Sequence, residues 1–525
     1  MKGDGGALAL VLHAHLPYVR SAQAGSLEED WFFQALLECY LPLLSVLEEA
    51  ASEVNQAPRL TVGLSPTLLS LLNDPDLVQR FPGWLEARLD LLPLADASLR
   101  QAADHLADRI RQQHQSWKDC DGDLIGRFAA LQRAGVVDLL TCGATHGYLP
   151  LLRQNPETVR GQLRTAVREH QRLIGERPLG IWLPECAYYE GLDALMRDAG
   201  LRYAVLDGHG LLHARPRPRY GVYAPICSRN GVAFFGRDSE ATLPVWSAKD
   251  GYPGHPAYRE FHRDLGWDLA LEALKPLNLS EPRPLSLKLH RVTNHSIALH
   301  NKQPYEPDVA AHCINVHAKD YLSGRRHQLN RLQQAMTNSE PLLVAPFDAE
   351  LFGHWWFEGP AFLKALFQQG PQEGVHFTRL RDVLQAAPNL QLCDPCPSSW
   401  GQGGYHNYWL NETNAWIVPE WERAGAAMVQ RCSRGVGSEQ ALAYLQQAGR
   451  ELLLAQSSDW SFILRAGTTT DLARERVERH LGRFWILMQA IDNGATLSND
   501  WLQAVEADDR LFPLIQPSDW AKVAG

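Results

Sequence analysis

The sequence predicts an α/β protein in which parallel strands form a barrel and a helical part follows. Short apolar runs each end in polar or charged residues, at positions 7–12, 60–64, 136–141, 180–183, 203–206, 232–235 and 342–345. Stretches with helix-type apolar spacing lie between several of these runs, as in alternating strand–helix folds. Beyond about residue 411, only helix-type spacing remains.

The strand candidates favour a barrel because of what stands at their ends. Continuous apolar runs are typical of strands buried on both faces, which is the parallel-sheet pattern. Polar groups at the carboxyl ends of many parallel strands are typical of the active-site face of a barrel. An open doubly wound sheet is the weaker alternative, because no glycine-rich phosphate loop follows the first run.

The intervals between runs predict the helices and the domain limits. Helical spacing covers residues 32–49, 98–127, 156–174 and 191–199. Residues 75–135 are nearly all helical and longer than one crossover needs, so they predict a helical insertion. A segment rich in Pro, Gly, Ser and Trp begins near residue 387. We therefore expect a barrel domain over 1–390 and a helical domain over 391–525, the latter built on 415–427, 438–454 and 472–491.

Composition narrows the class of protein. The 525 residues include 50 basic and 60 acidic side chains, a net charge of −10, which argues against nucleic acid as the main partner. No window reaches the ~20 apolar residues that span a bilayer, and the first residues are typical of a buried strand rather than a signal peptide. Nine scattered cysteines predict no disulfide framework, and Cys393 and Cys396 are interpreted mainly as bystander thiols. We expect a cytoplasmic protein with no membrane partner.

Tryptophan use points towards a sugar ligand. The chain has 16 Trp, as many as Phe. An indole offers an apolar face and a polar N–H, which suits ligands with one apolar side and a wet rim. Core packing remains the simpler explanation for most of these residues.

His13 and His15 end the first apolar run and stand two residues apart, so both side chains face the same side of a strand. Two functions fit this placement: metal ligation, or hydrogen bonds to a polar substrate. A metal would need further ligands, for which His146, Asp207 and Asp348 are candidates. The spacing alone leaves both possibilities open.

Two carboxylates also follow apolar runs. Glu185 comes after Trp-Leu-Pro, and Asp348 comes after Pro-Phe. Each by itself fits a helix cap or an ion pair, but a pair on one barrel rim fits glycoside chemistry, with a nucleophile and an acid/base. Glu350 is a rival to Asp348 because strand periodicity places it on the same side.

Aromatic residues gather in two segments. Trp355 and Trp356 follow Gly-His, while Trp400, Trp409 and Trp416 lie in or just beyond a Gly-rich segment. Such segments form little core by themselves, so we interpret them as an exposed aromatic platform and include Trp356 among the substrate-binding candidates. Asp459 precedes Trp460 in the helical C-terminal part, where a helix cap is an equally good explanation.

Five strings occur together and in order: LVLHAHLPYVR, ATHGY, WLPECAY, FDAELFGHWWFEG and SSDWSFIL. They resemble the five signature regions of glycoside hydrolase family 57, over about residues 7–515. The form FDAELFGHWW, together with VWSAKDGYPG and YREFHRD, looks like the α-1,4-glucan branching enzymes of that family.

The resemblance implies an incomplete (β/α)7 barrel with a helical insertion and a C-terminal helical domain that contributes to the cleft. It implies Glu185 as nucleophile and Asp348, rather than Glu350, as acid/base. Other matched positions line the donor-sugar site or hold the glucan chain; they are His13, His15, His146, Asp459, Arg259, Trp400 and Trp409. It also implies that no metal or other cofactor is needed, which favours the substrate-binding function for the histidines.

The implied reaction is retaining transfer. One carboxylate protonates the leaving glucan while the other forms a glycosyl-enzyme, and a 6-hydroxyl then takes the chain to make an α-1,6 branch. Residues 220–230 depart from the branching subgroup, which commonly carries a long loop with a functional Tyr there; Tyr223 is the nearest candidate. Weak branching, an amylase-like hydrolase or a 4-α-glucanotransferase are therefore alternatives. More distant ones are a metal-dependent hydrolase and a non-catalytic glucan-binding protein. The expected partner is an α-glucan, and either a monomer or a homodimer fits.

Overall fold

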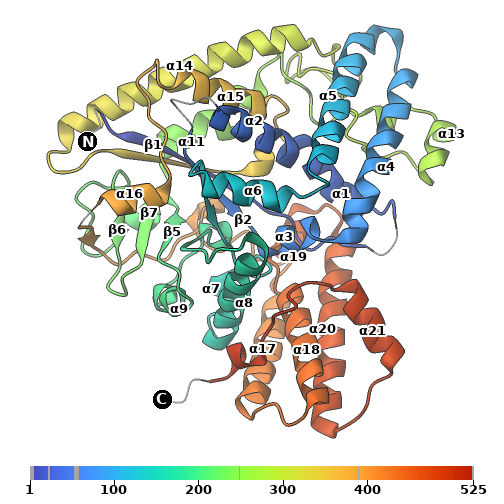
Figure 1. Cartoon of the computed structure of the whole chain (residues 1–525), viewed down its shortest axis with the longest axis vertical. Coiled ribbons are helices and arrows are strands. Elements are labelled where there is room, and N and C mark those ends of the chain that lie inside the picture. The colour runs from blue at the N-terminus through green and yellow to red at the C-terminus, as the bar shows by residue number, and fades with distance from the viewer. Residues whose placement is uncertain (1–4, 22–23, 53–57, 248, 388, 523–525) are drawn as a thin grey trace.

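The computed structural model describes residues 5–21, 24–52, 58–247, 249–387 and 389–522. It is a mixed α/β structure whose strands lie at the centre, with helices around them and a group of helices at one end (Figure 1). The first sheet has four parallel strands in the order β3-β2-β1-β8. These are β1 (Ala7–Ala14), β2 (Leu60–Leu64), β3 (Val137–Leu140) and β8 (Leu342–Asp348).

The second sheet has five short strands in the order β4-β5-β7-β6-β9. They are β4 (Gly180–Ile181), β5 (Tyr203–Leu206), β6 (Ile226–Cys227), β7 (Ala233–Gly236) and β9 (Gln391–Leu392). All neighbouring pairs are parallel except β6 and β7, which are antiparallel. The apolar runs predicted as strands are thus confirmed as β1, β2, β3, β4, β5, β7 and β8, whereas the two-residue strands β6 and β9 are too short to leave a pattern.

Backbone hydrogen bonds connect the two sheets at two places. Beyond β3, the Trp182 amide donates to the Thr141 carbonyl at 2.8 Å, which links the ends of β3 and β4. Beyond β7, the Asp238 amide donates to the Val344 carbonyl of β8 at 2.9 Å. The carboxyl ends of strands from both sheets are therefore held close together.

Helices follow most strands. Those in the strand-containing part with at least seven residues are α1 (Leu27–Ala35), α2 (Leu41–Ser52), α3 (Pro66–Leu72), α4 (Pro75–Leu91), α5 (Arg100–Asp119), α6 (Leu124–Arg133), α8 (Pro156–Ile174), α9 (Leu192–Asp198), α11 (Ser239–Trp246), α14 (Pro307–Ala335), α15 (Gly359–Gln369) and α16 (Leu380–Ala386). Shorter ones are α7 (Leu149–Leu152), α10 (Gly208–Leu212), α12 (Leu265–Asp268) and α13 (Leu271–Leu274). Between β2 and β3 the chain forms α3 to α6, so residues 75–135 are mostly helical.

Local sequence explains where two of these helices begin. The Ser65 hydroxyl accepts from the Leu68 amide, and Pro66 occupies the first position of α3. The Asp74 carboxylate likewise caps α4, again with a proline next. A side-chain oxygen at the cap and a proline that lacks an N–H both relieve the unpaired amides of a first helical turn.

One helix is long and apolar enough to cross a membrane by length and composition, which corrects the expectation that no such window exists. It runs from Leu27 to Ser52 and includes α1, a π-helical turn at Leu36–Tyr40, and α2. Within its apolar window, 83% is buried inside the protein, as in a core helix. Its side chains pack in the same hydrophobic core as β1 and β2.

The chain ends in helices α17 (Ile417–Ser433), α18 (Glu439–Ala455), α19 (Ser458–Ala466), α20 (Thr470–Asn493) and α21 (Asn499–Asp508). Of these, α17, α18, α20 and α21 are labelled in the orange and red group at the lower end of Figure 1, whereas α19 is labelled beside α3. Helix α19 begins beside the strand ends, since the Ser458 amide donates to the His146 carbonyl at 3.1 Å. This contact brings the C-terminal helices to the functional face of the sheets.

Candidate active site

A cavity of about 430 Å³ opens at the carboxyl ends of the strands. Its lining combines imidazoles, carboxylates and aromatic rings from β1, β8, the segments after β3 and β4, and α19. The lining residues are His13, His15, Leu16, Pro17, Trp31, Gln34, Ala35, His146, Glu185, Asp348, Glu350, His354, Trp355, Trp400, Asp459 and Phe462. Between the imidazoles and carboxylates the cavity surface is mostly apolar, which suits a ligand with both polar groups and apolar faces.

His13 and His15 both reach this cavity from the end of β1. The Nε2 atoms of His13 and His146 are hydrogen-bonded at 3.1 Å, and the His13 ring stacks on Trp182 with centroids 4.7 Å apart. The His15 Nδ1 is bonded to the Ser65 hydroxyl at 2.9 Å. Each imidazole therefore has a fixed orientation before any ligand binds.

His146 and Glu185 occupy strained backbone positions. Their φ angles are 56° and 62°, in the left-handed region that non-glycine residues rarely adopt. The His146 Nδ1 is bonded to the Ser458 hydroxyl at 2.8 Å and lies 3.9 Å from the Glu185 Oε1. Strain of this kind is typical of functional sites, where surrounding contacts hold a side chain in place.

Glu185 lies in the turn after β4, at the centre of the polar cluster. Its Oε2 accepts a hydrogen bond from the Trp400 indole at 2.8 Å. Burial and the nearby charge of Asp459 raise the pKa of Glu185 to about 7, although Trp400 and His15 act in the opposite direction. Near neutral pH this carboxyl is thus divided between its charged and neutral forms.

Asp348 ends β8 and lines the same cavity. Burial first, and then the negative charges of Glu350 and Glu185, raise the pKa of Asp348 well above its usual range, while Arg237 opposes the shift. These surroundings favour the protonated form of Asp348, as a general acid requires. Two carboxyl groups in one cavity with different surroundings are typical of an acid and nucleophile pair.

Glu350 is engaged by neighbours that hold it in place. Its Oε1 accepts from the Tyr40 hydroxyl at 2.5 Å and from the His15 amide at 3.1 Å. Burial raises the pKa of Glu350, while these donors oppose the shift. These two donors hold the Oε1 of Glu350 between the end of β1 and the π-helical turn.

Asp459 enters the site from α19. Its carboxylate accepts from the His15 Nε2 at 3.1 Å to each oxygen, and the Ser457 hydroxyl donates to it at 2.5 Å. Burial works to raise the pKa of Asp459, but attraction to His15 and these hydrogen bonds lower it to about 2. Asp459 is therefore a permanent negative charge at the cavity wall.

Three predicted substrate-binding residues do not line the cavity. Trp356 and Trp409 are each 2% exposed; Trp356 packs on Phe362, and Trp409 stacks on Tyr148. Arg259 is also buried, with Nη2 donating to the Glu38 Oε1 at 3.0 Å. The three side chains thus lie behind the cavity wall, which the local sequence did not show, and their predicted part in binding a glucan stays a prediction.

Among the other aromatic candidates, some line the cavity and some do not. Trp355, the neighbour of Trp356, is 57% exposed and lines the cavity. Its ring stacks on Phe261 with centroids 4.6 Å apart. Trp400 also lines the cavity, whereas Trp416 does not. Trp355 rather than Trp356 therefore presents a ring to a ligand.

Two further candidates lie elsewhere. Asp207, considered as a metal ligand, pairs with His209 at 3.0 Å and Arg237 at 3.3 Å, outside the cavity lining. Tyr223 is also outside it; its carbonyl accepts from the Leu342 amide at the start of β8. Neither residue is positioned to contact a ligand in the cavity.

Sequence reasoning missed several lining residues. Trp31 and Gln34 reach the cavity from α1, and Phe462 reaches it from α19 with 44% of its surface exposed. One of the two helices was predicted from its apolar spacing and the other was not assigned. Helical spacing does not show which exposed side chains reach a cavity formed by distant segments. The only sequence signal for a cavity-lining residue was an aromatic side chain on an otherwise polar helix face.

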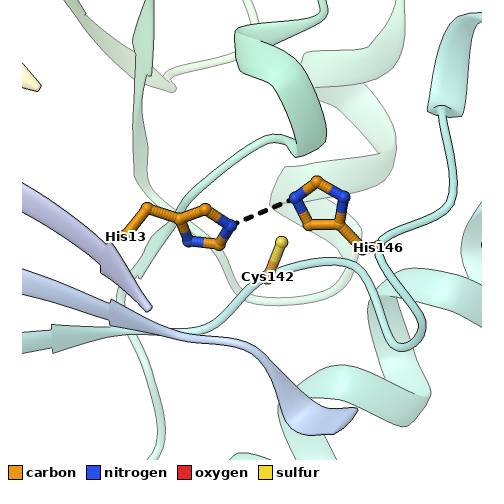
Figure 2. Close-up of side chains that lie close together, drawn as sticks. All are labelled: His13, Cys142 and His146. Carbon is orange, nitrogen blue, oxygen red and sulfur yellow. Dashed lines mark hydrogen bonds between the residues drawn. The ribbon is translucent and has the colours of Figure 1, made fainter. Parts of the chain in front are cut away.

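Among the residues that the structure describes, three groups of side chains have the composition and spacing to hold a metal ion. One is His13, Cys142 and His146, which Figure 2 shows in close-up. A second is His15, His146 and Asp459, and the third, remote from the cavity, is Glu451, His480 and Asp509. Among the described residues, Cys393 and Cys396 belong to no such group.

Comparisons with known proteins agree with this geometry. Residues 9–268 match the family model described as glycosyl hydrolase family 57, and residues 420–520 match a model of the C-terminal part of 1,4-alpha-glucan branching enzymes. A 1,4-alpha-glucan branching enzyme of Thermococcus kodakarensis is 31% identical over 90% of this chain and 72% of its own length.

Two solved structures are similar over nearly their whole length. The α-amylase AmyC of Thermotoga maritima is 34% identical with a TM-score of 0.91, covering 99% of this chain and 100% of its own. A branching enzyme of the same glycoside hydrolase type from Pyrococcus horikoshii is 29% identical with a TM-score of 0.89, covering 99% and 97%. One relative is thus named for hydrolysis and the other for transfer.

Proposed function

The chain belongs to glycoside hydrolase family 57, and from this premise we propose that it is a retaining 1,4-α-glucan branching enzyme. Glu185 is the nucleophile and Asp348 the general acid/base. The observation that carries the proposal is that both carboxyls line one cavity in different surroundings. The Trp400 indole donates to Glu185, whereas Asp348 is buried beside the negative charges of Glu350 and Glu185.

The reaction proceeds in two displacements. Asp348 donates its proton to the glycosidic oxygen of the leaving chain, and the Glu185 carboxylate forms a covalent bond to the anomeric carbon. Asp348, now ionised, then removes the proton from the 6-hydroxyl of an acceptor chain. That oxygen attacks the anomeric carbon, Glu185 leaves, and an α-1,6 branch results with net retention.

The surrounding side chains position the donor sugar. His13, His15 and His146 supply hydrogen bonds from one wall, and Asp459 holds the His15 ring. Trp400 favours the ionised nucleophile through its indole N–H, and Trp355 offers an apolar face to a sugar ring. We propose that the buried residues Arg259, Trp356 and Trp409 act only by supporting this wall.

We propose that the strands form the incomplete (β/α)7 barrel of this family, over about residues 1–390. Hydrogen bonds between β3 and β4 and between β7 and β8 support closure. Helices around residues 75–135 form an insertion, and residues 391–525 form a helical domain that completes the cleft with Asp459 and Phe462. We further propose a cytoplasmic protein, since all nine cysteines are free.

A specific observation favours a second function, hydrolysis of α-1,4-glucans. Residues 220–230 are short, and Tyr223 contacts β8 rather than the cavity. This segment therefore does not bring to the cavity the functional tyrosine that the resemblance implies for the branching subgroup. Similarity to the α-amylase AmyC points in the same direction. Water would then compete with the acceptor hydroxyl for the same intermediate.

The test is to incubate the purified protein with amylose and follow α-1,6 linkages by proton NMR together with new reducing ends. Several α-1,6 linkages for each new reducing end support the branching function. Reducing ends without α-1,6 linkages would replace it with hydrolysis. If neither product formed, the assignment of Glu185 and Asp348 would itself be overturned.

A further inference from the structure

A buried thiol lies beside the cavity, and the proposed reaction does not use it. Cys142 follows β3, and its side chain is 0% exposed. Figure 2 shows this thiol pointing towards the two imidazole rings of His13 and His146, near the hydrogen bond that joins them. The three ligand atoms lie within 4.8 Å of one another.

We propose that His13 Nε2, His146 Nε2 and Cys142 Sγ form an inhibitory site for Zn²⁺ or another divalent ion that prefers nitrogen and sulfur ligands. The ion is a reversible inhibitor that competes with the donor sugar for two imidazoles, and it is not a cofactor. Binding of the ion does not depend on the proposed function, which enters only through the activity readout.

The spacing of the ligands is close to what tetrahedral zinc requires. Zinc binds imidazole nitrogen at about 2.0–2.1 Å, so two such ligands at a tetrahedral angle are about 3.3–3.4 Å apart. His13 Nε2 and His146 Nε2 are 3.1 Å apart in the structure. A slightly larger separation, together with a rotation of both rings that turns their Nε2 lone pairs towards the ion, therefore replaces the shared hydrogen bond by two metal bonds.

The ligands have the protonation states that a metal needs. Burial lowers the pKa of His13 and of His146, so both rings are neutral at physiological pH. The Ser458 hydroxyl bonds the His146 Nδ1 at 2.8 Å, the outer contact that orients a metal-bound imidazole. Burial also raises the pKa of Cys142, so zinc must displace the thiol proton, and one proton leaves for each ion bound.

The ligand set also selects the ion. Two imidazoles and a thiolate suit zinc, whereas Mg²⁺ and Ca²⁺ prefer oxygen ligands. The rival group of His15, His146 and Asp459 is less suitable because the His15 and His146 rings lie face to face, with centroids 3.9 Å apart, whereas the Nε2 atoms of His13 and His146 face each other across 3.1 Å. Imidazole lone pairs lie in the ring plane, so two stacked rings do not aim at one ion.

Inhibition follows from the position of the site. His13 and His146 line the cavity, which gives the ion an open route. Once bound, it withdraws both imidazoles from the donor sugar and adds positive charge beside Glu185, whose Oε1 is 3.9 Å from the His146 Nδ1. That charge opposes the oxocarbenium-like transition state, in which positive charge develops at the anomeric carbon beside Glu185.

The test uses Co²⁺ as a coloured replacement for zinc, added to chelator-treated full-length protein. One equivalent is expected to give a thiolate-to-cobalt charge-transfer band, which Zn²⁺ then removes. The band should be lost in Cys142→Ala and persist in Cys393→Ser, the matched control that removes a different buried thiol. His13→Gln, which keeps Cys142, should weaken Co²⁺ binding at least tenfold and provides a second variant should Cys142→Ala fold poorly.

Activity supplies the second readout. Zn²⁺ should inhibit the wild-type enzyme reversibly, with recovery in chelator, and Cys142→Ala should need at least ten times more Zn²⁺ for half inhibition while retaining its basal turnover. A band that survives in Cys142→Ala, disappears in Cys393→Ser, or never forms would overturn the proposal. If no turnover were measured at all, the proposed function would fail, whereas the Co²⁺ band would still decide this site.

Discussion

The Trp400 indole donates a hydrogen bond to the Glu185 Oε2 at 2.8 Å, across 215 residues of sequence. This contact favours the ionised carboxylate and opposes the burial that raises the Glu185 pKa. It therefore connects the segment that follows β9 to the protonation of Glu185.

Trp400→Phe removes this donor while keeping an aromatic ring. We expect the pKa of Glu185 to rise, because the charged form loses a hydrogen bond worth roughly 1.5 kcal/mol, or about one pH unit. The acidic limb of the pH–rate profile should then move to higher pH, with a larger loss of turnover at pH 6 than at pH 8. A profile of unchanged shape would contradict the role given to this bond.

Replacing the two carboxyls tests their roles. Glu185→Gln and Asp348→Asn should each lower turnover on amylose by about 10³-fold or more, since each removes a group needed in the chemical step. Glu350→Gln is the matched control, a buried carboxyl at the same rim. With an aryl α-glucoside, whose leaving group departs without an acid, azide should restore turnover to Asp348→Asn and give a glycosyl azide of retained configuration. If Glu350→Gln lowered turnover as much as Asp348→Asn, the assignment of Asp348 rather than Glu350 as the general acid would be contradicted.

Adjacent tryptophans separate binding from stability. Trp355→Ala should raise KM for long glucans by about tenfold, since loss of an exposed sugar-facing ring removes ~1.4 kcal/mol of binding, with little change in unfolding temperature. Trp356→Ala should instead lower the free energy of unfolding by about 3–5 kcal/mol, because it empties a core position. Thermal unfolding and steady-state kinetics of both variants distinguish the two outcomes. Equal effects of the two substitutions on KM and on unfolding would contradict the different roles given to Trp355 and Trp356.

A buried acid pair predicts how stability depends on pH. Glu451 on α18 and Asp509 after α21 both have pKa values raised to about 7, chiefly by burial. The native state therefore keeps protons that the unfolded chain has already lost above about pH 5, so the free energy of unfolding falls as pH rises from about 5 to about 7.

Glu451→Gln should flatten this dependence because the amide does not titrate. We expect the unfolding temperature of the wild type to fall more than that of the variant between pH 5 and pH 8, by about 2–4 °C for each kcal/mol involved. Glu478→Gln, at an exposed glutamate of α20, is the control and should keep the wild-type slope. Parallel slopes for the wild type and Glu451→Gln would show that the pair does not titrate in this range.

Local sequence was sufficient for the strands and for the polar groups at their ends. An apolar run followed by His13, Glu185 or Asp348 carries its information within about ten residues, because burial on both faces requires a continuous apolar segment. The two-residue strands β6 and β9 lack this signal. Burial of Arg259, Trp356 and Trp409 also escaped prediction, since the same residue type serves a core or a cavity wall.

The sequence by itself thus determined the mixed α/β class, the order of strands along the chain and the family to which it belongs. Only the tertiary structure decided which side chains meet. Asp459 contacts His15 across 444 residues, and Trp355 faces the cavity while Trp356 does not. The reason is physical: a local pattern specifies the burial that each segment needs, whereas a site depends on distances between segments, which exist only after they pack.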